Sequence, residues 1–231
     1  MGETLRRSVL MSIDTETQPS FKVGEWHPTS LLQIATRDAR GEEDVVVIDL
    51  LSLKDGLRLP QILNEALAGP FASPEVLKLG VGLAEDLDDM VFAFGKTRFL
   101  KKVPGVLNLN VLHALAADNP EAPRSVGLRK LANIYLGKSL DKKNQTSSWA
   151  RRPLKDSQMN YAACDALVAL RVFDSLLEAL GKPDVEKLST TWTPKRYSEE
   201  GMVADKIVRL RRKVAARANA AGKEHIRYGR R

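Results

Sequence analysis

The chain has 231 residues, enough to bury a sizeable core in one large domain or in a domain with an appendage. Its 43% hydrophobic residues are an ordinary globular composition, no stretch approaches the roughly 18 apolar residues of a membrane span, and its single cysteine excludes an intrachain disulfide. The net charge of +7 favours an acidic partner, and we expect an intracellular protein, cytoplasmic or nuclear, without membrane association.

Three strands come first along the chain, and helices then alternate with one further strand. Apolar and β-branched runs bounded by turn residues predict the strands, and apolar residues at helical spacing predict the helices. The expected strands lie at 10–16, 30–36, 44–50 and 76–81, and the expected helices at 59–68, 84–94, 109–117, 125–136 and 157–180. This order predicts an α/β fold with a mixed sheet flanked by helices on both faces.

The first strand carries two carboxylates in the sequence SIDTET, residues 12–17. Because side chains alternate along a strand, Asp14 and Glu16 project from the same face. Two like charges there repel each other, and burying either one is unfavourable unless a positive group, such as a divalent cation, offsets it. Short acidic triplets also occur at strand ends where water solvates them, so this motif alone leaves both interpretations open.

A second acidic group follows the strand at 76–81. In LKLGVGLAEDLDDM, residues 77–90, four acids including Asp86 begin a helix. Acids in a first turn are stabilised by the helix dipole, so helix capping explains this group by itself. The Gly-Val-Gly segment lacks the third glycine of a dinucleotide-binding fingerprint, which argues against a nucleotide cofactor.

The last helix carries an isolated acid. In AACDALVAL, residues 162–170, Asp165 is the only charged residue, and Tyr161 lies one turn before it on the same side. The helix is apolar nearly all round, which predicts burial, and a buried aspartate needs a partner. That partner is either a metal ion or an arginine such as Arg171 or Arg152.

Together these motifs resemble those of the DEDD superfamily of 3′–5′ exonucleases, in the subgroup with tyrosine in the third motif. IDTE resembles the first motif, LKLGVGLAEDLDDM the second and YAACDA the third. The segments SLLQIAT and LGKSLDKKNQTSSWARRPLKDSQMNYAACDALVAL are similar to those of ribonuclease D, Werner-type exonucleases and especially Nibbler-like exoribonucleases. The resemblance covers about residues 8–180 and implies a ribonuclease H-like fold.

The resemblance also implies a catalytic set, which consists of Asp14, Glu16, Asp86, Tyr161 and Asp165. The four carboxylates would hold two divalent cations, one activating water and the other stabilising the leaving 3′ oxygen. These ions are expected to be Mg²⁺ or Mn²⁺, because the sequence has no Cys/His cluster suited to zinc. The tyrosine has an ordinary pKa of about 10, so we expect it to orient the attacking water and not to act as a base.

The expected partner is a nucleic acid, single-stranded RNA in preference to DNA. Within QTSSWARRPL, residues 145–154, Arg151 and Arg152 are expected to contact backbone phosphates, whereas Trp149, Pro153 and Leu154 are expected to fix the loop on the last helix. Further phosphate contacts are expected from the C-terminal tail, at Arg209, Arg211, Arg212 and Lys213.

The basic charge is concentrated in that tail. Residues 195–231 carry 12 Lys/Arg and 4 Asp/Glu, a net charge of +8, whereas residues 1–194 carry 24 and 25, a net charge of −1. A solvated tail or a nuclear localisation signal explains the same charge. We expect an exonuclease domain at 1–190 and a basic C-terminal extension at 191–231 that is partly helical or disordered.

The expected function is that of a metal-dependent 3′–5′ exonuclease that releases nucleoside monophosphates from single-stranded RNA. A Werner-type DNA exonuclease is the alternative within the class. A non-catalytic nucleic-acid-binding module with the same fold is the alternative outside it, but such a module has no reason to keep four mutually repelling acids. The sequence identifies no protein partner.

Overall fold

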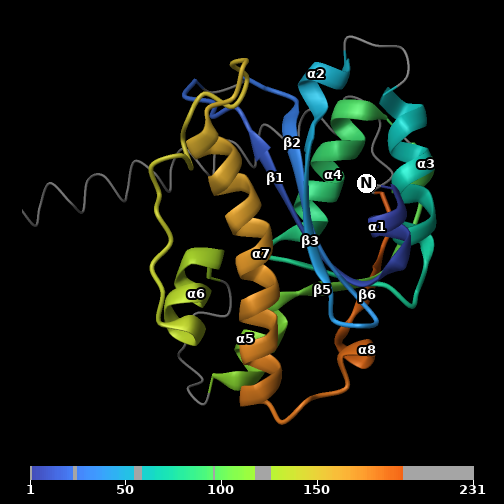
Figure 1. The fold of residues 1–231 in the computed structure, drawn as a ribbon, viewed down its shortest axis with the longest axis vertical. Coiled ribbons are helices and arrows are strands. Elements are labelled where there is room, and N and C mark those ends of the chain that lie inside the picture. Colours follow the sequence, from blue (N-terminus) through green and yellow to red (C-terminus); the bar gives the residue numbers. More distant parts are fainter. Residues whose placement is uncertain (1, 23–24, 55–58, 96, 118–125, 195–231) are drawn as a thin grey trace, which may run out of the picture. The chain divides into compact units, whose positions relative to one another are not determined.

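The computed structural model describes residues 2–22, 25–54, 59–95, 97–117 and 126–194 (Figure 1). Within these ranges, the residues up to 18 and from 28 onward form one compact unit, and those between 19 and 27 belong to another. The strands are β1 (Ser8–Thr17), β2 (Thr29–Asp38), β3 (Glu43–Asp49), β4 (Leu77–Gly80), β5 (Val103–Asn108) and β6 (Thr190–Trp192). The helices are α1 (Gly2–Arg7), α2 (Leu50–Lys54), α3 (Leu59–Ala72), α4 (Leu83–Phe94), the short 3₁₀ helix η1 (Arg98–Leu100), α5 (Leu109–Ala116), α6 (Leu128–Leu136), α7 (Asp156–Ala179) and α8 (Val185–Leu188). Across these described ranges, no helix is long and apolar enough to cross a membrane.

The strands form one mixed sheet in the order β3-β2-β1-β4-β5-β6. The first three strands are a meander of antiparallel neighbours, β1 and β5 each pair in parallel with β4, and β6 pairs antiparallel with β5. Parallel neighbours need a crossover connection, which α4 provides between β4 and β5. The predicted α/β class with a mixed sheet is therefore confirmed.

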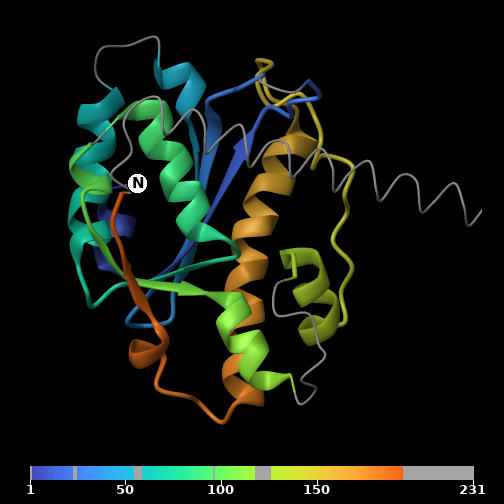
Figure 2. The same cartoon turned by 180° about the vertical axis from the view of Figure 1, so that it is seen from behind.

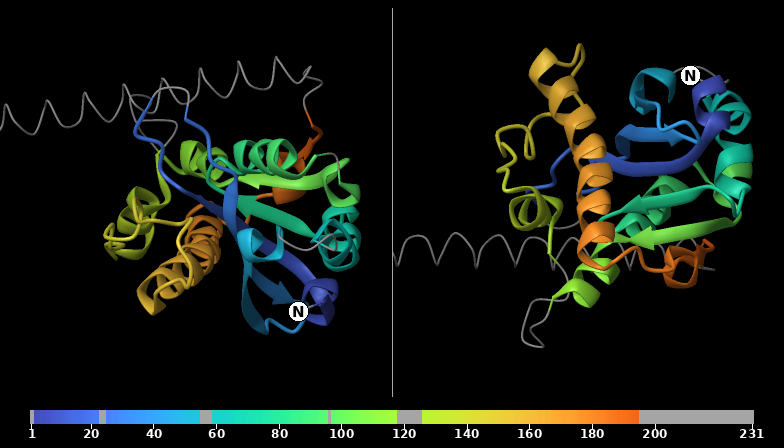
Figure 3. Two further views of the ribbon diagram at one scale, coloured as in Figure 1. Left: turned by 90° about the horizontal axis from the view of Figure 1, so that it is seen from above. Right: turned by 60° about the horizontal axis from the view of Figure 1, so that its bottom comes forward.

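Helices cover both faces of this sheet (Figures 2 and 3). On one face α7 packs across β1 to β4 with α5 and α6 beside it, and on the other face α4 contacts β1 and β5. Along β1, Leu10 points to the α7 side, where it joins a buried cluster with Leu79 and Leu170. Because Asp14 and Glu16 share its strand parity, they continue the same row and end beneath α7.

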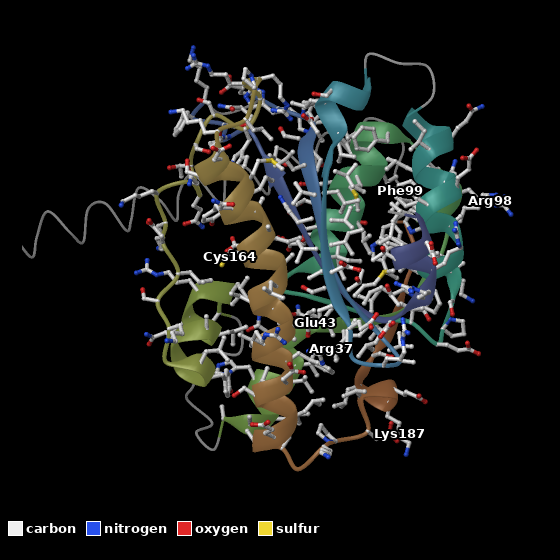
Figure 4. All side chains as sticks on the ribbon, viewed as in Figure 1. Arg37, Glu43, Arg98, Phe99, Cys164 and Lys187 are labelled. Atoms are coloured by element: carbon white, nitrogen blue, oxygen red, sulfur yellow. The ribbon has the colours of Figure 1, made fainter. Side chains whose placement is uncertain are left out.

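An ion-pair cluster joins α7 to the β2–β3 hairpin. The Arg37 guanidinium donates hydrogen bonds to Asp174 at 2.7 Å and to Glu43 at 2.7 and 2.9 Å, and Arg171 also binds Glu43. Figure 4 shows Arg37 and Glu43 close together in this region. These partly buried, bidentate contacts fix the register of α7 on the sheet.

The strands β5 and β6 were not predicted. Pro104 and Gly105 interrupt the apolar run of β5, and β6 has only three residues, so neither gives a clear strand pattern. In β6, Trp192 is 7% exposed and pairs with Val103. The compact fold thus continues past residue 190, where the sequence placed the domain boundary, and the predicted basic tail, 195–231, lies outside the described residues.

The helix expected to end before Gly69-Pro70 was predicted too short, because α3 continues to Ala72. Pro70 lies in the last turn, so it removes only one backbone hydrogen bond of the helix. Phe71 is fully buried and its ring packs edge to face on Phe99, with ring centroids 5.7 Å apart. The burial of this side chain outweighs the lost hydrogen bond.

Candidate active site

Three of the predicted acids converge at the end of β1. One carboxylate oxygen from each of Asp14, Glu16 and Asp165 lies within 4.8 Å of the other two. Asp14 pairs across the sheet with Gln33, and Asp165 comes from α7, which covers this face and is apolar around it. Carboxylates at this separation are the ligands that a hard divalent cation requires.

Burial and mutual repulsion raise the pKa values of these acids. Burial, and then the charge of Asp165, raises the pKa of Asp14 to about 7. Burial, and then the charges of Asp14, Asp165 and Asp86, raises the pKa of Glu16 to about 9. Burial raises the pKa of Asp165 to about 6, although a hydrogen bond from Tyr161 opposes this rise. A bound cation would offset this repulsion, so the donor set fits a metal site.

Tyr161 lies one helical turn before Asp165 and shares a hydrogen bond with its carboxylate. Burial, and then the nearby carboxylates, raise the pKa of Tyr161 far above its ordinary value, so the hydroxyl keeps its proton and acts as a donor. The Trp149 ring is fully buried, 6.0 Å from the Tyr161 ring, and packs with Leu31 and Ala162. The expected structural role of Trp149 is confirmed, and its ring also positions the tyrosine.

The fourth predicted acid, Asp86, lies outside this three-acid cluster. It sits in the first turn of α4, and its carboxylate accepts a hydrogen bond of 2.7 Å from the Thr15 hydroxyl. Its charge still raises the pKa of Glu16, so the two carboxylates interact. The sequence analysis did not identify Thr15 as part of the site. Its position between Asp14 and Glu16 is the feature of the sequence that could have indicated it.

The proposed arginine partners of Asp165 are engaged elsewhere, so the ion-pair alternative is wrong. Arg171 binds Glu43, and Arg152 donates two hydrogen bonds to Asp49, at 2.5 and 2.6 Å. Arg152 also donates to the Trp149 carbonyl at 2.7 Å, which ties the loop to β3. These contacts give Arg152 a structural role, and its expected phosphate contact stays a prediction.

The remaining predicted phosphate contacts also stay predictions. Arg151 is exposed and makes no ion pair with any residue that the structure describes. The four tail residues, Arg209, Arg211, Arg212 and Lys213, lie outside the described ranges. Cys164, labelled on α7 in Figure 4, precedes Asp165 and is exposed.

Gln33 is a buried polar residue beside the acids that the sequence analysis did not single out. It lies directly opposite Asp14 in β2, and its side chain is fully buried. Neither its amide nitrogen nor its amide oxygen has a hydrogen-bond partner among the described protein groups. A buried amide in this position suits an ordered water molecule shared with the neighbouring carboxylate.

Gly80 ends β4 next to the acids, where two backbones approach closely. A Cβ atom at this position would lie 2.8 Å from the backbone oxygen of Ile13, the residue before Asp14. Any side chain there would push β1 aside and move the carboxylate. The glycine that the sequence placed at the end of a strand therefore supports the geometry of the acids.

A cavity of about 760 Å³ opens beside the carboxylates. The end of β1 and the middle of α7 form its acidic side, and α6 with the following loop forms its other side. Its volume is within the range of about 300–1,000 Å³ that is common for small-ligand sites. The polar residues that line it include Asp14, Glu16, Tyr161 and Asp165 on the first side and Arg129, Lys130, Asn133, Lys142 and Gln145 on the second.

Known proteins are similar to this chain in sequence and in fold. The exonuclease mut-7 homolog of Aedes aegypti is 33% identical over 190 residues, which are 78% of this chain and 25% of that protein. A ribonuclease D of Gluconacetobacter diazotrophicus is 31% identical over 178 residues, 77% of this chain and 39% of that protein. This chain thus spans well under half the length of these curated relatives.

The crystal structure of the Aedes aegypti Nibbler EXO domain superposes with a TM-score of 0.63 at 29% identity, covering 80% of this chain and 86% of that one. The sequence profile of a 3′–5′ exonuclease family matches residues 1–181, which include all five predicted catalytic residues. The chain therefore belongs to the 3′–5′ exonuclease family.

Proposed function

We propose that this chain is a metal-dependent 3′–5′ exonuclease that hydrolyses single-stranded RNA to nucleoside monophosphates. The observation that carries the proposal is the convergence of the Asp14, Glu16 and Asp165 carboxylates, within 4.8 Å of one another, at the edge of a cavity. Membership of the family supports the direction of the reaction. Clustered acids whose burial and charges raise the pKa values of Asp14 and Glu16 are unfavourable in a protein that only binds RNA.

The residues that would hold metal are Asp14, Glu16, Asp165 and Asp86. All their donor atoms are carboxylate oxygens, which favours two hard cations, Mg²⁺ or Mn²⁺. Such cations, when bound, supply an activated water and charge stabilisation for the leaving 3′ oxygen. Tyr161 keeps its proton near Asp165 and is placed to hold the attacking water by a hydrogen bond.

The names of the relatives favour RNA over DNA, because one of them is a ribonuclease D. A single-stranded 3′ end suits a cavity next to the acids, since an unpaired terminal nucleotide can enter it without a complementary strand. The alternative substrate is single-stranded DNA, which differs at the 2′ position. A direct comparison of the two polymers distinguishes them.

The test is a time course on single-stranded RNA labelled at either end, with Mg²⁺, Mn²⁺ or EDTA, beside DNA of the same sequence. We expect a metal-dependent ladder that shortens from the 3′ end of RNA, and no product from Asp14→Asn or Asp165→Asn. Asp44→Asn is the matched control, because this exposed acid lies in β3 away from the cavity. Faster cleavage of DNA would show that DNA, and not RNA, is the preferred substrate. Binding without cleavage of either polymer would favour a binding module.

The basic tail is proposed to add phosphate contacts outside the cavity. Four of its cations, Arg209, Arg211, Arg212 and Lys213, fall within five residues of sequence. Deleting residues 195–231 should weaken RNA binding and flatten its dependence on salt, because fewer counterions are then released. An unchanged affinity and salt slope would contradict this role.

A further inference from the structure

We infer that the RNA strand runs from the carboxylate cluster along α6 and the loop at 138–145, where Arg129, Lys130 and Lys142 hold its backbone phosphates. This inference rests on the proposed function and moves the phosphate contacts to a wall that the sequence analysis did not identify. We call these three residues the cationic wall. They line the same cavity as the carboxylates, on its other side.

The position of the cationic wall in α6 is unfavourable for the helix itself. Arg129 and Lys130 occupy its first turn, which contains no acid. The positive end of the helix dipole repels cations there, and sequences normally place acids at such positions. The same end favours an anion, so a phosphate beside this turn would be attracted by the side chains and by the helix terminus together.

The cations of this wall are available to a ligand. Arg129, Lys130 and Lys142 are exposed, and none of them makes an ion pair with a residue in the described part of the chain. The arginines expected from sequence differ in this respect. Arg152 is bound to Asp49, and neither it nor Arg151 lines the cavity.

One side of the cavity carries the acids expected at the scissile phosphate, and the other side carries cations suited to the phosphates that precede it in the strand. The acids on β1 and α7 repel phosphates unless cations neutralise them, so the acidic side alone cannot hold the rest of the strand. The cationic wall supplies the missing attraction for the upstream phosphates. One acid, Asp141, also lines this side, and Lys143 pairs with it. Asn133 and Gln145 lie on the same side and offer amide hydrogen bonds to bases or ribose hydroxyls.

The experiment compares the full chain with a variant that carries Arg129→Ala, Lys130→Ala and Lys142→Ala. Each protein also carries Asp14→Asn for anisotropy measurements with a labelled single-stranded RNA over a range of salt. We expect the affinity to fall about tenfold and the salt slope to decrease by about 2, at roughly 0.7 for each phosphate contact. Arg98→Ala is the control that should change neither value, because Arg98 is exposed in η1 and does not line the cavity.

A second measurement locates the contacts on the substrate. In the active protein, the triple variant should raise the KM for short RNAs and leave kcat nearly unchanged. Methylphosphonates, which are uncharged, placed at the second and third linkages from the 3′ end should raise KM for the wild type but add little in the triple variant. Thermal melting of the triple variant checks that it folds.

The outcomes separate this inference from the proposed function. Cleavage that is unaffected by the triple variant, with a loss caused by Arg151→Ala instead, would overturn the cationic wall and leave the exonuclease intact. Weaker RNA binding by the triple variant, in a chain that cleaves no RNA at all, would support the wall and refute the proposed function. Equal salt slopes for all variants would also overturn the wall.

Discussion

Replacing Asp14 by Asn should abolish cleavage and, in the absence of metal, make the protein more stable. Two unit charges 4.8 Å apart at an effective dielectric constant of about 20 repel by roughly 3.5 kcal/mol. If the hydrogen bonds of the buried Asn amide are incomplete, they lower the stabilisation of the variant by about 1–3 kcal/mol. A net stabilisation of about 1–2 kcal/mol corresponds to a rise in Tm of roughly 2–8 °C for a chain of this size.

The assay is thermal unfolding at pH 8 in EDTA, repeated with Mg²⁺ or Mn²⁺. The wild type should gain stability from the cation, by about 2.7 kcal/mol at a concentration one hundred times the Kd, whereas Asp14→Asn should gain much less. Asp44→Asn is the control, and as a surface change it should stay within about 0.5 kcal/mol of the wild type. A lower Tm for Asp14→Asn in EDTA, or an undiminished response to metal, would refute the electrostatic argument.

Three further predictions concern the same region. Gly80→Ala should lower both Tm and kcat, because the added methyl group would lie 2.8 Å from the Ile13 carbonyl oxygen. Gly69→Ala has no atom near its Cβ and should stabilise α3 by about 0.5–1 kcal/mol. Equal Tm and kcat values for the two variants would contradict this prediction. In EDTA the Tm should fall as the pH rises from 6 to 9. The pKa is raised to about 7 for Asp14 and to about 9 for Glu16, so these groups contribute folding stability that is present below pH 4 and lost as they ionise. Mg²⁺ should flatten this dependence of Tm on pH. Asp49→Asn should cost about 1 kcal/mol at pH 7 and clearly less at pH 2. The pKa of Asp49 is lowered to about 2, so its stabilising contribution is present above pH 4 and declines as the pH falls toward 2, where half of the carboxylates are protonated. Urea titrations at both pH values measure the difference.

The local sequence pattern was sufficient to predict the elements that have a regular hydrophobic periodicity or a continuous apolar run. The three antiparallel strands, β4 and the long α7 all have clear periodicity or apolar runs, and their central residues were predicted. The strands β5 and β6 were missed because tertiary pairing stabilises them despite weak local signals. The same holds for the last turn of α3, where the buried Phe71 overrides the local effect of Pro70.

The start of α7 shows another limit of local reasoning. The helix that was expected to begin at residue 157 begins at Asp156, and the side chain of Gln158 accepts a hydrogen bond of 3.1 Å from the Lys155 N–H. Gln158 also donates to the Ser147 hydroxyl, so it joins the helix start to the preceding loop. A contact of this kind depends on where the loop passes, which no local pattern specifies.

The candidate site was predictable where its residues follow a short motif and unpredictable where they depend on position in three dimensions. The pairing of Asp14 with Glu16, and of Tyr161 with Asp165, follows from strand and helix periodicity. The role of Arg152 did not, because Asp49 lies 103 residues earlier in the chain and meets it only in the folded protein. The proposed cationic wall was missed for the same reason, since its residues meet the acids of β1 and α7 only in the folded protein.

The distribution of the acids along the chain has a consequence for biosynthesis. Two of the clustered acids are in the first strand, while Asp165 and Tyr161 enter with α7, the last long helix of the described fold. A nascent chain that ends before residue 156 contains β1 to β5 but lacks Tyr161 and Asp165, one of the three clustered acids. The carboxylate cluster is therefore complete only after the C-terminal part of the domain has been synthesised and α7 has packed against β1.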